Sequence, residues 1–190
     1  MPDVYFTSDT HFGHQNILKY CPLSRPWATV EEMDEAIIDN WNRTVKPGDT
    51  VYHLGDFALC KGNDPEVYSK RLNGHIFLIR GNHDGNHYRT CKGFDWVGEA
   101  YQGRMIKWDR KKFFLSHYAM HVWDGYQYGI PCLYGHSHGS LPERPGVLSF
   151  DVGMDCWNCQ PVSMEQVMDK LRGIQVVELD HHAKNIQDIL

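Results

Sequence analysis

The chain has 190 residues, with 19 Lys and Arg against 24 Asp and Glu, and a formal net charge of −5 at pH 7. This length suits a single domain, placed at residues 1–190, with a core large enough to need no disulfide or structural metal. The mild acidity argues against a broad nucleic-acid-binding face. The sequence has no apolar run near 18 residues and no basic, then apolar, N-terminal segment, so we expect a cytoplasmic protein without membrane contact.

The cysteines do not indicate a zinc or redox site. Six are scattered along the chain, and Cys156 and Cys159 form its one C-x-x-C pair. A structural zinc site would usually need a second such pair, which the sequence lacks. A redox-active pair would lie at the start of a helix next to the first βαβ unit, and this pair does not. We therefore expect free thiols.

The first half of the chain alternates β-rich runs with amphipathic segments. Thr29, followed three residues later by Glu32, predicts a helix that begins with a capping box. The run Asp64-Pro65-Glu66 is typical of another helix start. Strands are predicted at 4–8, 50–54 and 75–80, and helices at 15–20, 29–45 and from 64 to before Gly74.

The second half is mostly strand-like, with one late helix. The helix is predicted from Ser163 through Leu171 and ends at Gly173. Strands are predicted at 95–100, 105–108, 112–115, 131–134, 147–152 and 174–179. This order suggests two sheets packed face to face with helices outside.

Groups that can bind metal ions recur where the predicted strands end, which is where α/β folds gather their sites. Side chains two positions apart on a strand point the same way, so Asp9 and His11 can bind one ion together, and His136 and His138 repeat this spacing. Mixed carboxylate and imidazole ligands suit Mn, Fe, Ni or Zn. The groups are Asp9-Thr10-His11, Gly55-Asp56, Gly81-Asn82-His83-Asp84, Ser116-His117 and Gly135-His136-Ser137-His138.

The complete set contains seven candidate ligands, which is too many for one ion and suits two. Asn82 adds an amide oxygen and His117 another imidazole. Two ions about 3.5–4 Å apart can hold a bridging hydroxide for in-line attack on a phosphoryl group. Asp56 is the expected bridge between them. His83 is the candidate general acid, with Asp84 beside it to fix its tautomer.

This ordered set resembles the calcineurin-like metallophosphoesterase family. The stretches 8–14, 51–57 and 152–155 also resemble a small bacterial and phage-type branch of it. The resemblance implies a four-layer αββα sandwich of two mixed β-sheets flanked by helices, the metallo-dependent phosphatase fold. It also implies roles for the matching residues: Asp9, His11 and His138 on one ion; Asn82, His117 and His136 on the other; Asp56 as bridge; and His83, supported by Asp84, as catalytic histidine.

The expected function is that of a dinuclear metal-dependent phosphoesterase, a phosphoric ester hydrolase, with Mn as the first choice of ion and Fe, Ni or Zn as alternatives. A phosphodiester, such as a nucleotide or a nucleic-acid end, is favoured because an acid catalyst matters most for a poor alkoxide leaving group. One alternative is a phosphomonoesterase or protein phosphatase of the same fold. Another, from a different class, is a non-catalytic metal-binding scaffold.

Further residues are candidates for substrate binding. The aromatic loop around Trp123 could stack a nucleobase or merely cover the core. The sequence does not decide the oligomeric state, and a homo-oligomer is one of the options. The predicted substrate contacts are His14, Arg25 and Arg80.

Overall fold

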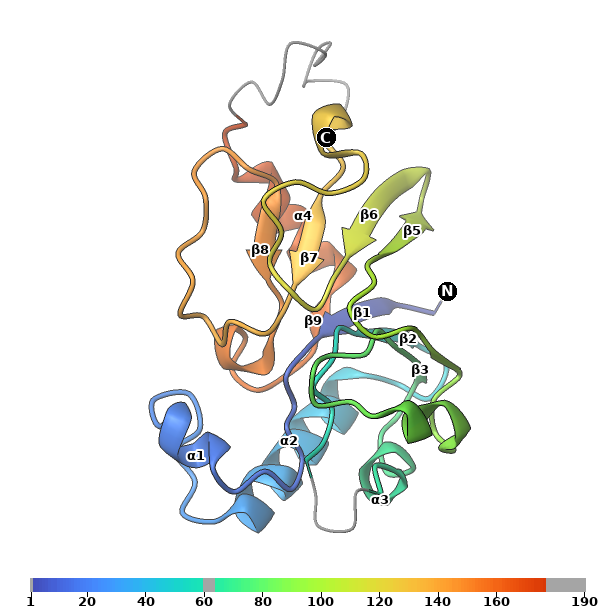
Figure 1. Cartoon of the computed structure of the whole chain (residues 1–190), viewed down its shortest axis with the longest axis vertical. Helices are drawn as coiled ribbons and strands as arrows, with labels where there is room; N and C mark the ends of the chain where they lie inside the picture. Colours follow the sequence, from blue (N-terminus) through green and yellow to red (C-terminus); the bar gives the residue numbers. More distant parts are fainter. Residues whose placement is uncertain (1, 60–63, 177–190) are drawn as a thin grey trace.

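A computed structural model of the chain describes residues 2–59 and 64–176. Within these residues, two β-sheets pack against each other and helices cover the outside of the first sheet (Figure 1). The first sheet has the strand order β4-β3-β2-β1-β9, and the second has the order β5-β6-β7-β8. The predicted α/β class, with two mixed sheets flanked by helices, is confirmed.

The first sheet is mainly parallel. Its neighbouring strands β1, β2, β3 and β4 run in the same direction, and β9 is antiparallel to β1. The carboxyl ends of β1, β2 and β3 therefore lie at the same edge. The strands are β1 (Val4–Thr7), β2 (Thr50–His53), β3 (His75–Leu78), β4 (Trp96–Val97) and β9 (Val162–Ser163).

The second sheet combines a hairpin with parallel strands. Strands β5 (Arg104–Trp108) and β6 (Lys111–Leu115) are antiparallel. Strands β7 (Cys132–Tyr134) and β8 (Ser149–Asp151) then run parallel to β6. The carboxyl ends of β6, β7 and β8 thus share an edge.

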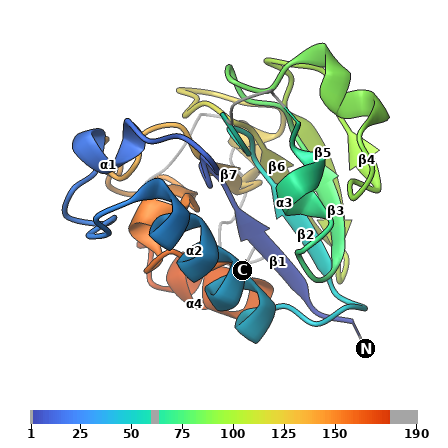
Figure 2. The same ribbon diagram turned by 90° about the horizontal axis from the view of Figure 1, so that it is seen from below.

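The longest described helix, α2, begins as predicted. The Thr29 side chain accepts a hydrogen bond from the backbone N–H of Glu32, whose side chain accepts one from the backbone N–H of Thr29. Figure 2 shows α2 along β1, with α3 over β2 and β3. The helices are α1 (Ile17–Tyr20), α2 (Val30–Thr44), α3 (Glu66–Ser69) and α4 (Met164–Arg172), with 3-10 helices η1 (Asn86–Thr90), η2 (Tyr126–Tyr128) and η3 (Met154–Cys156).

The alternation of side chains along the strands separates the core into layers. In β1, Tyr5 packs in the cluster that contains Trp41 of α2, whereas Phe6 packs with Phe113 between the two sheets. The α4 helix joins the inter-sheet cluster through Val167, Leu171 and neighbouring apolar residues. The outer face of the second sheet packs beneath the buried ring of Trp123, so this aromatic loop covers the core.

Several boundaries differ from those predicted. Helix α3 begins at Glu66, two residues after the predicted start, and ends at Ser69, before Gly74 as predicted. Strand β9 has only two residues, too few for a periodic signal. Residues 174–176 of the predicted last strand are irregular, and the rest of that segment lies outside the described residues. No helix in the described ranges is both long and apolar enough to cross a bilayer.

Candidate metal centre

The seven predicted ligands meet between the carboxyl edges of the two sheets. Asp9 follows β1, Asp56 follows β2, and Asn82 follows β3 in the first sheet. His11 also follows β1. The other three imidazoles come from the second sheet, where His117 follows β6, and His136 and His138 follow β7. The shared strand directions thus bring together residues that lie up to 129 positions apart in the chain.

The first half-site consists of Asp9, His11 and His138, whose ligand atoms all lie within 4.8 Å of one another. The Asp9 Oδ1 atom is 3.8 Å from His11 Nε2 and 3.9 Å from His138 Nε2. Asp9 Oδ1 and His11 Nε2 are buried, with no hydrogen-bond partner in the described structure. Burial also raises the pKa of Asp9 to about 8. A cation among these three ligands would satisfy both atoms and stabilise the carboxylate.

The second half-site is centred on Asp56, His117 and His136, whose ligand atoms also lie within 4.8 Å of one another. His117 Nδ1 donates to the carbonyl oxygen of Leu54 at 2.8 Å, so Nε2 of the neutral ring presents a lone pair. That nitrogen lies 3.0 Å from Asn82 Oδ1 and 3.5 Å from Asp56 Oδ2. His117 Nε2, Asn82 Oδ1 and Asp56 Oδ2 therefore converge, and each offers a lone pair. Such a set of nitrogen and oxygen ligands suits a divalent cation.

Asp56 lies between the two half-sites. Its Oδ1 atom accepts a hydrogen bond from the backbone N–H of His83 at 2.9 Å. Its Oδ2 atom lies 3.7 Å from His11 Nε2 and 3.5 Å from His117 Nε2. One carboxylate oxygen thus faces ligands of both half-sites, as the predicted bridging role requires.

Buried charged side chains hold the first half-site from behind. The Asp155 carboxylate accepts hydrogen bonds from His138 Nδ1 at 2.7 Å and from Arg25 Nε at 2.9 Å. Burial opposes ionisation of Asp155, but these hydrogen bonds keep its pKa well below the ordinary range. Burial also opposes the charge on His138, yet its bond to Asp155 raises its pKa to about 10. This bond directs Nε2 of His138 toward Asp9.

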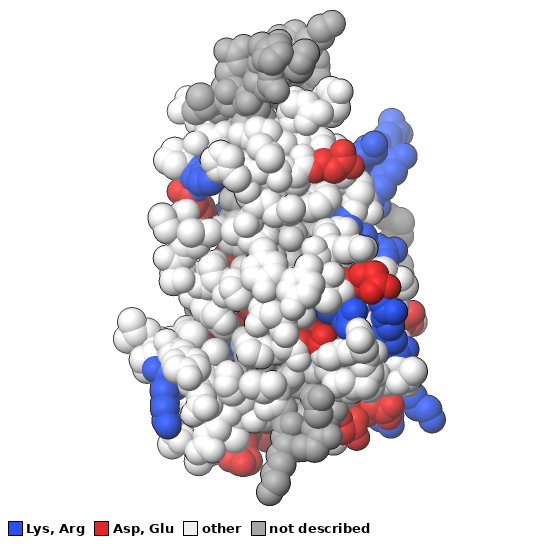
Figure 3. All heavy atoms as spheres, in the orientation of Figure 1, with Lys and Arg blue, Asp and Glu red and all other residues white. Residues whose placement is uncertain are grey.

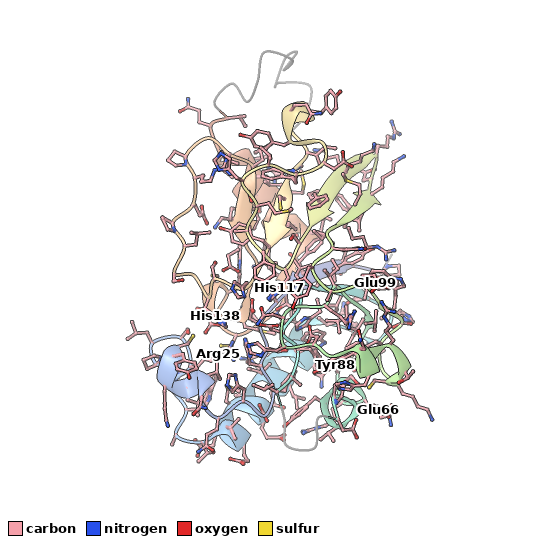
Figure 4. All side chains as sticks on the ribbon, viewed as in Figure 1. Arg25, Glu66, Tyr88, Glu99, His117 and His138 are labelled. Carbon is pink, nitrogen blue, oxygen red and sulfur yellow. The ribbon has the colours of Figure 1, made fainter. Side chains whose placement is uncertain are left out.

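Arg25 and His53 support the chain around Asp9 and His11. Arg25 donates to the carbonyl oxygens of Asp9 and Thr10. His53 Nδ1 accepts from the N–H of Gly55, so its Nε2–H donates to Thr10 Oγ1 at 3.0 Å. Burial lowers the pKa of His53 to about 3, which matches this neutral tautomer. Figure 4 shows Arg25 and His138 close together beside the centre.

The second half-site has a more open environment. His136 is exposed, whereas His11 is buried and His138 half-buried. The Tyr118 hydroxyl donates to Asn82 Oδ1 at 3.1 Å, and the Tyr118 ring lies 4.5 Å from that of His136. In the described part of the chain, the ligands of the second half-site are therefore supported by a backbone carbonyl and a tyrosine, and not by a buried ion pair such as the one behind His138.

The ligands depend on an unusual local backbone. Five ligand residues have positive φ angles: Asp9, His11, Asp56, His136 and His138. Such angles are uncommon for residues other than glycine and often mark functional sites. The glycine before His136 is needed for space, because a Cβ at Gly135 would overlap Ser8 Oγ. The Gly-His pattern thus reflects the close approach of the loops after β1 and β7.

Two further histidines border the centre. The His83 side chain is 39% exposed, with Nε2 3.9 Å from Asp56 Oδ2. His14 is partly buried, and its Nδ1 lies 3.3 Å from His11 Nδ1. The rings of His14 and His83 are 6.1 Å apart. The structure thus places His83 where it can reach both solvent and a group bound at the centre.

The expected support of His83 by Asp84 needs correction. Both carboxylate oxygens of Asp84 accept backbone N–H groups, from Asp56, Phe57 and Gly81. Burial raises the pKa of Asp84 to about 7 despite these bonds. Asp84 joins the loops after β2 and β3, so it positions ligands and not the His83 imidazole.

The predicted substrate contacts of Arg25 and Arg80 are also wrong. Arg25 is 1% exposed, and its donors are taken by Asp155 and by backbone carbonyls. Arg80 is 3% exposed and donates to the Gly98 carbonyl and to Asn86. Both guanidiniums are thus committed within the protein. Among the predicted substrate contacts, His14 is the one whose side chain contacts a candidate ligand, His11.

Sequence reasoning assigned no role to Asp155 or Thr10. Asp155 lies in the stretch 152–155 that supported the resemblance, but its partner His138 is 17 positions earlier. No short-range signal connects such a pair. The cysteines agree with the prediction in the described part of the chain, where Cys156 and Cys159 are free thiols.

Comparisons with known proteins identify relatives and a similar fold. An uncharacterised protein of Methanocaldococcus jannaschii is 35% identical over 189 residues, covering 93% of this chain and 96% of the relative. The Gene 66 protein of Mycobacterium phage L5 is 36% identical over 101 residues, covering 52% of this chain and 47% of the phage protein. A solved structure of a protein of unknown function from Aquifex aeolicus has a TM-score of 0.70 and 27% identity, covering 90% of this chain and 100% of that one.

The family model described as calcineurin-like phosphoesterase matches residues 2–184, nearly the entire chain. That span includes both half-sites, Asp56 and His83. Members of this family act on phosphate esters and depend on metal ions. The chain therefore belongs to the calcineurin-like phosphoesterase family.

Proposed function

We propose that this protein is a dinuclear metal-dependent phosphodiesterase. The observation that carries the proposal is the convergence of two ligand clusters on Asp56 Oδ2. The buried atoms Asp9 Oδ1 and His11 Nε2 also have no hydrogen-bond partner among the described residues. Asp9, His11 and His138 would hold one ion, and Asn82, His117 and His136 the other. The mixed oxygen and nitrogen set suits Mn first, with Fe, Ni or Zn as alternatives.

The protein's own groups account for proton transfer and orientation. Bound divalent ions would supply Lewis acidity and lower the pKa of water for attack on phosphorus. His83 would donate its proton to the leaving alkoxide oxygen, because it is partly exposed and borders Asp56. His14, which contacts both His11 and His83, would orient these rings and touch the substrate phosphate.

The distribution of cations favours a diester over a monoester. A phosphate monoester carries more negative charge and is commonly bound by arginine side chains. Here Arg25 and Arg80 are buried in internal contacts and offer no free guanidinium to the cleft. The first half-site also borders a cavity of about 720 Å³ lined by His138, Tyr20 and Ser140, which gives space for a second ester arm.

A small nucleotide or a nucleic-acid end fits better than long duplex DNA. The face shown in Figure 3 is largely uncharged, and Lys and Arg side chains lie mostly along its right-hand edge, from β5 and β6 downward, with acidic residues among them. A phosphomonoesterase remains the alternative within the same fold, and a non-catalytic metal-binding scaffold is the alternative from another class.

The test compares bis(p-nitrophenyl) phosphate with p-nitrophenyl phosphate, using metal-stripped protein to which Mn, Fe, Ni or Zn is returned. We expect metal-restored hydrolysis, faster with the diester. His83→Ala should lower the rate by about 10²–10⁴-fold, with unchanged metal binding, and His75→Ala at an exposed strand start is the matched control. Faster monoester hydrolysis would favour the phosphatase, and metal binding without turnover would favour the scaffold.

A further inference from the structure

Two tyrosines lie side by side next to the second half-site. The Tyr101 and Tyr118 rings are nearly parallel, with an interplanar angle of 14° and centroids 6.2 Å apart. Tyr118 also contacts the second half-site, because its hydroxyl donates to Asn82 Oδ1 and its ring packs against those of His117 and His136. An aromatic surface thus extends from the candidate ligands to the protein surface.

Tyr101 is exposed although its conformation is costly. The residue is 70% exposed, and its φ of 63° lies in the left-handed region. That region is unfavourable for a bulky side chain and persists where the surrounding structure imposes it. Tyr101 belongs to none of the hydrophobic clusters of the described residues. Packing of the core therefore does not explain why this ring is held here.

Buried contacts fix the loop that carries Tyr101. Arg80 donates to the Gly98 carbonyl at 2.8 Å, and the Gly98 N–H donates to the Leu78 carbonyl at 2.8 Å. Glu99 lies 3.6 Å from Arg80 and pairs with Arg89. Figure 4 shows Glu99 on the other side of His117 from His138. The loop therefore approaches the centre from the side opposite the Arg25–Asp155 pair.

We propose that Tyr101 and Tyr118 form a stacking surface for the nucleobase of a phosphodiester substrate, an inference that rests on the proposed function. A phosphoryl group bound at the metal centre would lie beside Tyr118, so an attached nucleoside could place its base against the two rings. Stacking on aromatic side chains is tolerant of base identity because every base has a π-face. A cationic group would be disfavoured at this position by the adjacent metal ions.

The test uses two esters that share a leaving group. One is the p-nitrophenyl ester of thymidine 5′-monophosphate, and the other is ethyl p-nitrophenyl phosphate, which lacks a base. Tyr101→Ala should lower kcat/KM for the thymidine ester about tenfold and leave that for the ethyl ester unchanged. Tyr101→Phe keeps the ring and should retain the wild-type preference. Tyr128→Ala is the matched control, because Tyr128 is similarly exposed on η2.

A binding measurement separates stacking from catalysis. Titration calorimetry of the Mn-loaded protein should show about tenfold weaker binding of thymidine monophosphate to Tyr101→Ala, with ethyl phosphate unaffected. Equal losses for both ligands, or no loss for either, would overturn the stacking surface. If the wild-type protein hydrolyses neither ester with any of the four metals, the phosphodiesterase proposal fails, while calorimetry still decides whether the tyrosines bind the base.

Discussion

The two half-sites share Asp56 but differ in what surrounds them. Behind the first, His138 contacts Asp155, which pairs with the buried Arg25. Behind the second, His117 donates to a backbone carbonyl, and the Asn82 amide oxygen accepts from a tyrosine that borders solvent. One half is fixed by a buried ionic network, and the other by two neutral hydrogen bonds, of which that from Tyr118 to Asn82 borders solvent.

This difference suggests a division of labour. Partners that orient metal-binding side chains commonly contribute 10–100-fold, or about 1.4–2.7 kcal/mol, to metal affinity or activity. The Asp155 contact keeps His138 directed at Asp9 even without an ion, so the first half-site is preorganised. The second includes the exposed His136 and lies next to Tyr101 and Tyr118. We therefore expect tighter ion binding in the first half-site and substrate approach from the side of the second.

Asp56→Asn should have the largest effect, because it affects both half-sites at once. Replacing the shared carboxylate with an amide removes one negative charge from Oδ2, which faces ligands of both. We expect kcat/KM to fall about a thousandfold, comparable to the loss of a central electrostatic contact, together with weaker binding of both ions in a metal titration. Asp39→Asn on the exposed face of α2 is the matched control. Loss of a single ion would contradict the bridging role.

Arg25→Met tests the ionic network behind the first half-site. It would leave the buried Asp155 carboxylate without its guanidinium, and breaking a buried pair typically costs about 3–5 kcal/mol of unfolding free energy. Arg71→Met breaks the exposed ion pair with Glu35 and should cost at most about 1 kcal/mol. Chemical denaturation of both variants gives the comparison. Similar losses for the two would show that the network does not stabilise this half-site.

The sequence predicted the elements whose signals are local. The capping box of Thr29 and Glu32 marked the start of α2 correctly, and the β-rich runs marked most strands. Elements held by tertiary contacts gave no such signal. Strand β9 contributes only two residues, Val162 and Ser163, and forms because Phe6 and Tyr5 of β1 offer a free edge beside it.

The same distinction applies to the site. The residues that point into the centre were found because strand ends place Asp, Asn and His at recognisable spacings. Residues that act through others were misjudged: Arg25 was expected to meet substrate, and Asp84 to meet His83. Which partner a buried guanidinium or carboxylate finds depends on long-range contacts, such as the 130 positions between Arg25 and Asp155.

His53→Gln tests the neutral histidine beneath the loop after β1. The pKa of His53 is about 3 in the folded protein, against about 6.5 when unfolded. Between these values the unfolded chain binds the additional proton, so stability falls as the pH is lowered. From pH 7 to pH 5 this contribution amounts to about 2 kcal/mol of unfolding free energy.

The measurement is the unfolding free energy of wild-type and variant proteins at several pH values. The wild-type protein should lose more stability than His53→Gln between pH 7 and pH 5, since other titrating groups act equally in both. His121→Gln, in an exposed loop, should retain the wild-type slope. Parallel slopes for His53→Gln and the wild-type protein would show that folding does not lower the pKa of His53.

Tyr118→Phe should have the smallest effect and should be confined to the second half-site. It removes the hydrogen bond to Asn82 Oδ1, worth about 0.5–1.5 kcal/mol, but keeps the ring. We expect the more weakly bound ion to lose about 2- to 10-fold in affinity, with the tighter ion and the preference for the thymidine ester unchanged. Tyr101→Phe, which leaves the Asn82 contact intact, should bind both ions as the wild-type protein does. If Tyr118→Phe instead weakened binding of the tighter ion, the half-site that contains Asn82 would be the one that binds its ion more tightly. The expected order of ion affinities in the two half-sites would then be reversed.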